Sequence, residues 1–132
     1  MKVYIAAPYT CRAAAIAVMH VLEAAGHVVT SRWLRETNPN CDANAKKDLT
    51  DIDNADALLA LNFKEWQDKG SGGRHVELGY ALALGKRIVL YGPRTNIFHH
   101  LDSVTAVDSI GGVLSALASD LFEGLQEKEA IK

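Results

Sequence analysis

Three scarce features narrow the class of protein that this chain of 132 residues belongs to. Cysteine occurs twice, at Cys11 and Cys41, which is too few for a disulfide framework and lacks metal-type spacing. We therefore expect reduced thiols and a cytoplasmic protein. The apolar run at 3–7 is too short for a signal peptide, and none is long enough to span a membrane. The formal net charge of -2 argues against binding nucleic acid through its phosphates, but leaves a small anionic ligand open.

The remaining composition, 48% hydrophobic and 23% charged, is that of a globular protein, and the length fits one domain, 1–132. Short apolar runs alternate with segments of helical periodicity. The predicted strands cover residues 3–7, 27–31, 56–61, 87–91 and 104–108. The predicted helices start near residue 10, after Asp42 as a candidate N-cap, and near residues 74 and 109, and the last runs to about 125. This alternation predicts a three-layer α/β/α sandwich around a five-stranded parallel sheet, of the flavodoxin or Rossmann type.

Helical periodicity also predicts the buried faces of two helices. In the first helix, the spacing favours burial of Ala13, Ile16, Ala17, His20 and Val21. In the helix over 74–84, it favours Val76, Gly79, Tyr80, Ala83 and Leu84. In such a sheet, the ligand site is expected at the carboxyl ends of the strands, beside the first strand.

The loop after the third strand carries the most informative residues at that edge. Ser71-Gly72-Gly73 leads into a helix, where glycines allow close approach of a ligand and free N–H groups bind anions. Many such turns are only structural, and both interpretations stay open. Glu77 lies near the start of the same helix, where the helix dipole is expected to stabilise its charged form. It is either a nucleophile at the ligand edge or a residue that merely complements the dipole.

The segment from Gly72 to Lys86 resembles the nucleoside 2-deoxyribosyltransferase family, which includes deoxyribonucleoside 5'-monophosphate N-glycosidases. The family pattern has an aromatic residue on the first strand, Asp-Leu before a third-strand Ala-Asp, and Gly-x-x-x-Glu-Leu-Gly-x-Ala-x-x-x-Gly-Lys. It is matched here, over roughly residues 2 to 101, by Tyr4, Asp48-Leu49, Ala55-Asp56 and Gly73 through Lys86.

The resemblance implies roles for three residues. Glu77 would attack the anomeric carbon of a ribose or deoxyribose, as carboxylates do in glycoside cleavage. Asp48 would protonate the departing base, and Tyr4 would hydrogen-bond Glu77. A half-buried strand aromatic is the alternative for Tyr4. Of the other nearby acids, Asp51 is expected to pair with Lys47 on a solvated face, and Asp56 to be structural.

The resemblance also bears on whether the substrate carries a phosphate. Ser71 and Gly73 match the monophosphate hydrolases, since transferases of free nucleosides tend to have an acidic residue at position 71. Thr10 and Arg12 are candidates for further phosphate contacts. However, the loop 7–12 departs from the Gly/Ser/Arg-rich loop of those hydrolases, and both substrate classes stay open.

Partners and cofactors follow in part from the resemblance. Asn96 matches a segment that completes a neighbouring subunit's site, which implies a homo-oligomer, a dimer or larger. Tyr9, Trp33 and Phe98 are candidates for stacking on the base or for packing. His99-His100 lacks the further ligands that a metal needs, so we expect no metal and no cofactor.

Two hypotheses about function emerge. The first is an enzyme that cleaves the N-glycosidic bond of a (2'-deoxy)nucleoside or its 5'-monophosphate through a covalent intermediate on Glu77. The sugar then passes to water or to an acceptor base. The second is a non-catalytic nucleotide-binding or sensing domain of the same fold.

Overall fold

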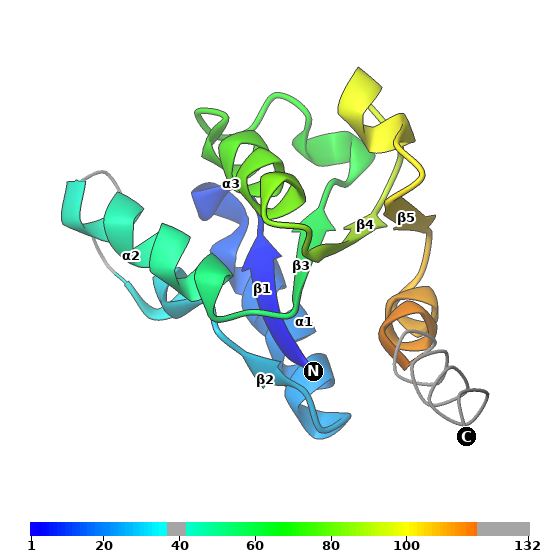
Figure 1. The fold of residues 1–132 in the computed structure, drawn as a ribbon, viewed down its shortest axis with the longest axis horizontal. Helices are drawn as coiled ribbons and strands as arrows, with labels where there is room; N and C mark the ends of the chain where they lie inside the picture. Colours follow the sequence, from blue (N-terminus) through cyan, green and yellow to red (C-terminus); the bar gives the residue numbers. More distant parts are fainter. Residues whose placement is uncertain (37–41, 119–132) are drawn as a thin grey trace.

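Five parallel strands form the centre of the protein in a computed structural model that describes residues 1–36 and 42–118 (Figure 1). The strands are β1 (Lys2–Ala6), β2 (Val28–Val29), β3 (Ala57–Leu61), β4 (Arg87–Tyr91) and β5 (Val104–Val107). Their order across the sheet is β2-β1-β3-β4-β5, and each neighbouring pair is parallel. The predicted five-stranded parallel sheet is confirmed.

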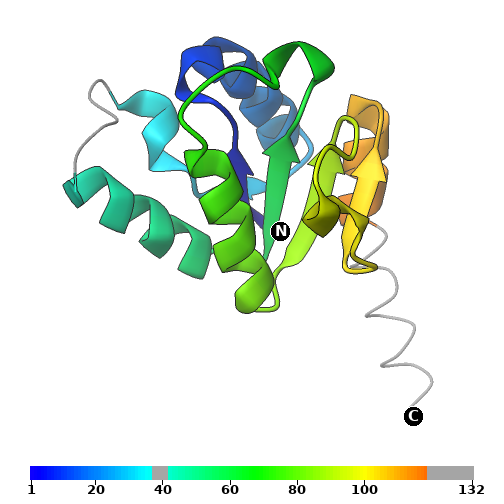
Figure 2. The same ribbon diagram turned by 90° about the horizontal axis from the view of Figure 1, so that it is seen from above.

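Helices cover both faces of this sheet. They are α1 (Arg12–Ala24), α2 (Asp42–Asp53), α3 (Gly73–Ala83) and a helical segment over 110–118. Figure 2 shows α2 and α3 on one face and α1 with the 110–118 segment on the other, which confirms the three-layer α/β/α sandwich. The remainder of the predicted last helix, 119–125, lies outside the described residues. Within the described ranges, none of the helices has the length and apolarity needed to cross a bilayer.

Four short 3-10 turns connect these elements, namely η1 (Tyr9–Cys11), η2 (Arg32–Arg35), η3 (Lys64–Trp66) and η4 (Ile97–His100). The chain leaves β1 through α1 towards β2, and leaves β3 through α3 towards β4. The two connections diverge at the boundary between β1 and β3, and such a switch point opens a crevice at the carboxyl edge. Residues Val3 to Ala6 and most of β3 and β4 are fully buried, so this edge rests on the rigid part of the core.

Two predicted boundaries were wrong for local reasons. The strand at 27–31 has only two ladder residues, because Ser31 Oγ takes the place of a backbone acceptor and receives the Ile5 N–H at 2.6 Å. The first helix begins at Arg12, two residues later than expected, because Cys11 N donates to Pro8 O at 2.9 Å and closes a 3-10 turn.

The predicted buried faces of α1 and α3 were also wrong. α1 buries Ala15, Met19 and Leu22, and α3 buries Arg74, Leu78 and Ala81. α1 is rich in alanine, which occurs on several sides of the helix and does not select a face, whereas α3 carries apolar residues on two faces. In α3, the expected stripe is instead largely exposed, with Val76 at 69% exposure and Leu84 at 46%.

Candidate active site

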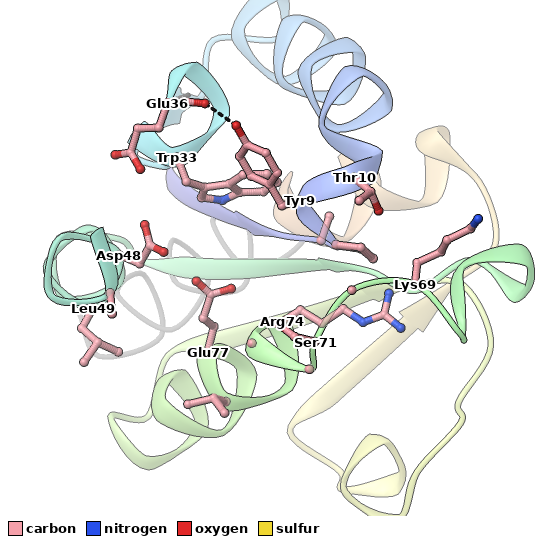
Figure 3. A pocket seen from close by; sticks show the side chains of 17 residues that line it. Tyr9, Thr10, Trp33, Glu36, Asp48, Leu49, Lys69, Ser71, Arg74 and Glu77 are labelled. Atoms are coloured by element: carbon pink, nitrogen blue, oxygen red, sulfur yellow. Dashed lines mark hydrogen bonds between the residues drawn. The ribbon is translucent and has the colours of Figure 1, made fainter. Parts of the chain in front are cut away.

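A pocket of about 530 Å³ lies at the predicted edge of the sheet (Figure 3). Its walls come from the loop after β1, the end of η2, the middle of α2 and the segment 69–77. It brings together seven of the predicted site residues, namely Tyr9, Thr10, Asp48, Ser71, Gly72, Gly73 and Glu77. Segments that are distant in the sequence therefore converge on a single pocket.

Glu77 is anchored to the centre of the sheet. The hydroxyl of Tyr4, a fully buried residue of β1, donates a hydrogen bond to Glu77 Oε2. This contact is the one that the family resemblance implied. Burial raises the pKa of Glu77 to about 8, the Tyr4 hydrogen bond opposes this rise, and the charge of Asp48 adds to it.

That result corrects the expectation that the helix start holds Glu77 in its charged form. Glu77 is the fifth residue of α3, and no acidic residue lies in the first turn. The dipole effect fades beyond the first turn, so desolvation dominates. Glu77 is therefore a half-buried carboxyl that Tyr4 holds in place, and its raised pKa of about 8 favours the protonated form at neutral pH.

Asp48 contributes a second carboxyl from α2. Burial raises its pKa to about 6, with further increases from the charges of Glu36 and Asp51. Its Oδ1 is buried and has no hydrogen-bond partner within the described residues. A carboxyl that lines a pocket, has a raised pKa and has an unpartnered oxygen has the properties of a general acid or base.

The neighbouring acids differ from the expectation in one case. Asp51 is 3% exposed and pairs with Arg32, whose Nε lies 2.8 Å from Asp51 Oδ1. The predicted pair with Lys47 on a solvated face was therefore wrong, because α2 turns Asp51 towards the core, while Lys47 Nζ lies 2.5 Å from Glu36 Oε1. Asp56 accepts the Lys2 N–H at 3.0 Å at the amino end of the sheet, away from the pocket, and is structural as expected.

The other side of the pocket is built to accept negative charge. Gly72, which lines the pocket as the residue before α3, has φ +93°, a left-handed conformation that favours glycine, and the start of a helix favours anions. Arg74 is only 8% exposed and donates to Trp66 O at 3.1 Å through Nη2, whereas its Nη1 has no partner within the described residues. Lys69 and Ser71 line the same side (Figure 3).

Arg74 was missed by the sequence analysis. It occupies an unspecified position of the family pattern, and an arginine at a helix start is ordinarily exposed. The only available signal was its place directly after two glycines at a predicted anion site.

A comparison with known protein families identifies the family of this chain. The profile of the nucleoside 2-deoxyribosyltransferase family matches residues 3–108. The chain belongs to this family. No curated protein matches it significantly.

Two solved structures have a similar fold. The Clostridium botulinum CMP N-glycosidase BcmB is 23% identical, with a TM-score of 0.63 over 89% of this chain and 98% of that chain. A 2-deoxyribosyltransferase from Leishmania mexicana is 23% identical, with a TM-score of 0.53 over 83% of this chain and 75% of that chain. Family membership supports an activity of the nucleoside deoxyribosyltransferase type.

Of the predicted substrate-binding residues of this family member, two do not line the pocket, namely Arg12 and Asn96. Arg12 Nη1 donates to Glu36 O, and its guanidinium lies 5.3 Å from the centre of the Tyr9 ring. Asn96 caps η4, accepting from Phe98 N at 2.9 Å, and Phe98 is 57% exposed beside it. Their direct roles with substrate stay predictions.

The two histidines of η4 differ in exposure, since His99 is buried and His100 is exposed. His99 is 1% exposed, and its Nδ1 accepts the Thr95 N–H at 3.0 Å. Among residues 1–36 and 42–118, no three histidine, cysteine or acidic side chains gather as a metal site would require.

Proposed function

We propose that this protein cleaves the N-glycosidic bond of a nucleoside 5'-monophosphate. The observation that carries the phosphate is Arg74, a nearly buried cation with an unpartnered N–H group beside Ser71 and the start of α3. Leaving such a donor unpaired costs about 1–3 kcal/mol, more for a charged group, and a phosphate dianion supplies the missing acceptor. The Clostridium botulinum neighbour is a CMP N-glycosidase.

The proposed reaction uses the two carboxyls on the opposite side. A Glu77 carboxylate oxygen attacks C1' of the sugar, the C1'–N bond breaks, and its electron pair leaves with the base nitrogen. Asp48 gives its proton to the base as it departs. Water, or a ring nitrogen of a second base, then attacks C1' and displaces the Glu77 carboxylate from the ester, and the proton that the attacking group loses returns to Asp48.

Tyr4 acts in this scheme as a positioning residue. Its hydrogen bond favours ionised Glu77 over the neutral form that burial favours. Positive charge that develops on the sugar in the transition state further stabilises the ionised form.

Chromatography of free base tests the proposal, using a panel of nucleosides and their 5'-monophosphates with and without an acceptor base. We expect the monophosphates to be favoured by at least about tenfold in kcat/KM, which corresponds to one charge-assisted hydrogen bond. Arg74→Gln should remove this preference and leave kcat/KM for free nucleosides within about threefold. Preference for free nucleosides would overturn the phosphate assignment, and binding without base release would favour a sensing domain.

A second variant guards against loss of folding in Arg74→Gln. Lys69→Met alters an exposed side chain of the pocket and should raise KM for monophosphates only. Lys64→Met is the matched control, because Lys64 is equally exposed and does not line the pocket.

We also propose that two copies assemble through a groove beside the pocket. The groove is lined by His75, Val76, Leu78, Gly79, Leu82, Ala83, Asn96, Phe98 and Leu101. Val76 lines both the groove and the pocket, so a second copy seated there reaches the active site. Phe98→Asp should yield a monomer by light scattering, whereas Val28→Asp, at the similarly exposed β2, should not. A monomeric wild-type protein would overturn the assembly.

A further inference from the structure

We propose that Glu36 recognises the base of the substrate and selects a base with an exocyclic amine over its carbonyl counterpart. Cytosine and adenine are such bases, and uracil and hypoxanthine are their counterparts. The proposal rests on the function proposed above for the same pocket.

The first argument is an unexplained acceptor in the pocket. The Glu36 side chain is 13% exposed, and its Oε2 is buried without a hydrogen-bond partner within residues 1–36 and 42–118. Its other oxygen lies 2.5 Å from Lys47 Nζ. A carboxylate paired with an ammonium accepts hydrogen bonds and donates none. A ligand that fills this part of the pocket must therefore bring an N–H or O–H group, or leave the oxygen unpaired.

The second argument is that Glu36 is fixed before a ligand arrives. Its backbone carbonyl accepts from the Tyr9 hydroxyl at 2.6 Å and from Arg12 Nη1. These two side chains come from η1 and the first residue of α1, and they attach the end of η2 to that segment. A carboxylate held from both its backbone and its side chain loses little freedom on binding, which favours selectivity.

The third argument is the order of groups along the pocket. Figure 3 shows Glu36 and Asp48 on the side away from Lys69, Ser71 and Arg74. With phosphate at Arg74 and C1' at Glu77, the base extends towards Glu36.

Aromatic rings line that end of the pocket. Tyr9 and Trp33 lie with ring centres 6.2 Å apart, and both line the cavity, so a base has an aromatic wall to contact. The edge of a base that rests there is placed to meet the carboxylate of Glu36.

The chemistry of that edge decides which bases fit. An exocyclic amine donates to Oε2, whereas a carbonyl oxygen at the same ring position places two acceptors against each other. Sites built to hydrogen-bond a substrate group reject the analogue without it strongly, because the site's own polar group stays unpaired. We therefore expect at least about a tenfold preference for the amino base, the equivalent of about 1.4 kcal/mol.

Matched nucleotide pairs test this directly. CMP is compared with UMP, and AMP with IMP, in the ribo and deoxyribo forms, by kcat/KM for base release and by calorimetric Kd. The wild type should prefer each amino nucleotide by at least about tenfold. Glu36→Gln keeps the shape and offers an amide N–H to a carbonyl, so the preference should vanish or reverse. Glu65→Gln, an exposed glutamate outside the pocket, is the matched control and should leave the ratio unchanged.

The measured preferences show whether Glu36 selects the base. Equal use of the amino and carbonyl nucleotides by the wild type, or a preference that Glu36→Gln leaves intact, would overturn the role of Glu36. Glu36→Ala, with its thermal unfolding measured alongside, checks the result should the Gln variant fold poorly; it should remove the preference without reversing it. If amino nucleotides bind selectively but no base is released, the proposed reaction fails and the recognition by Glu36 stands.

Discussion

Removing the Tyr4 hydroxyl should impair base release in a way that depends on pH. The phenol donates to Glu77, and this bond opposes the rise that burial causes in the pKa of Glu77. A hydrogen bond to a charged group contributes about 1.5–3 kcal/mol, and one pKa unit corresponds to about 1.36 kcal/mol. Tyr4→Phe should therefore raise the pKa of Glu77 from about 8 by a further one to two units.

The size of the effect follows from the two carboxyls together. The productive form has Glu77 ionised and Asp48 protonated, the reverse of what pKa values of about 8 and about 6 favour. That form is then about 1% of the enzyme between pH 6 and 8. The apparent pKa values seen in the pH profile of kcat/KM therefore belong to Glu77 and Asp48 together rather than to either residue alone. In a plot of kcat/KM against pH, Tyr4→Phe should lower the plateau between pH 6 and 8 by about 10- to 100-fold. The decline on the alkaline side should begin at a higher pH in the variant, so that the kcat/KM values of the two enzymes converge near pH 10.

The assay is kcat/KM for base release from a 5'-monophosphate, measured from pH 5 to 10. Tyr80→Phe is the control, because the Tyr80 hydroxyl donates to Asp53 at 2.6 Å away from the pocket. A loss in Tyr4→Phe that is equal at every pH would refute the argument that Tyr4 acts through the ionisation of Glu77. An unchanged rate would refute its positioning role altogether.

Three further variants test the site and the fold. Glu77→Gln should abolish base release yet stabilise the protein by up to a few kcal/mol. The pKa of Glu77 is higher in the folded than in the unfolded protein, so the wild type loses stability as pH rises from about 4.5 to about 8. Melting temperatures of both proteins over a series of pH values test this. Asp48→Asn should slow poor leaving bases more than activated ones, and a uniform loss would contradict its role as acid. Gly92→Ala places a Cβ 2.2 Å from Asn62 O, whereas Gly85→Ala, where φ is also positive, places its Cβ in open space. In urea titrations, Gly92→Ala should lower the free energy of unfolding by at least about 2 kcal/mol more than Gly85→Ala.

Strands were easier to predict from this sequence than helix faces. Residues 87–91 form β4 as predicted, because a buried parallel strand is a short apolar run with clear ends. In α3, two apolar stripes compete, and only packing against the sheet selects the one with Leu78 and Ala81. The exposed stripe at Val76 borders the groove, so its apolar character reflects a second surface of the same helix.

Some residues of the site could also be predicted from the sequence, and others could not. The family pattern led to Glu77 and Tyr4, whose hydrogen bond spans 73 residues of sequence. Arg74 and Glu36 were beyond sequence reasoning for a physical reason. Their importance lies in unpartnered atoms, which exist only once the neighbouring elements have packed. Asp51 was misassigned because the i, i+4 rule gives a possible pair but not the direction in which the helix faces.

The attachment of Glu77 to β1 also determines how heat inactivates the protein. Tyr4 lies in the fully buried centre of the sheet, where amide hydrogens exchange only when the whole domain opens. The loop carrying Lys69 and Ser71 is exposed and belongs to the part that opens locally at lower free energy. On warming, the contribution of Lys69 and Ser71 to phosphate binding should therefore decline before bond cleavage does, whereas the nearly buried Arg74, on the same helix as Glu77, should keep its contribution. Part of the substrate specificity would then be lost at a lower temperature than turnover.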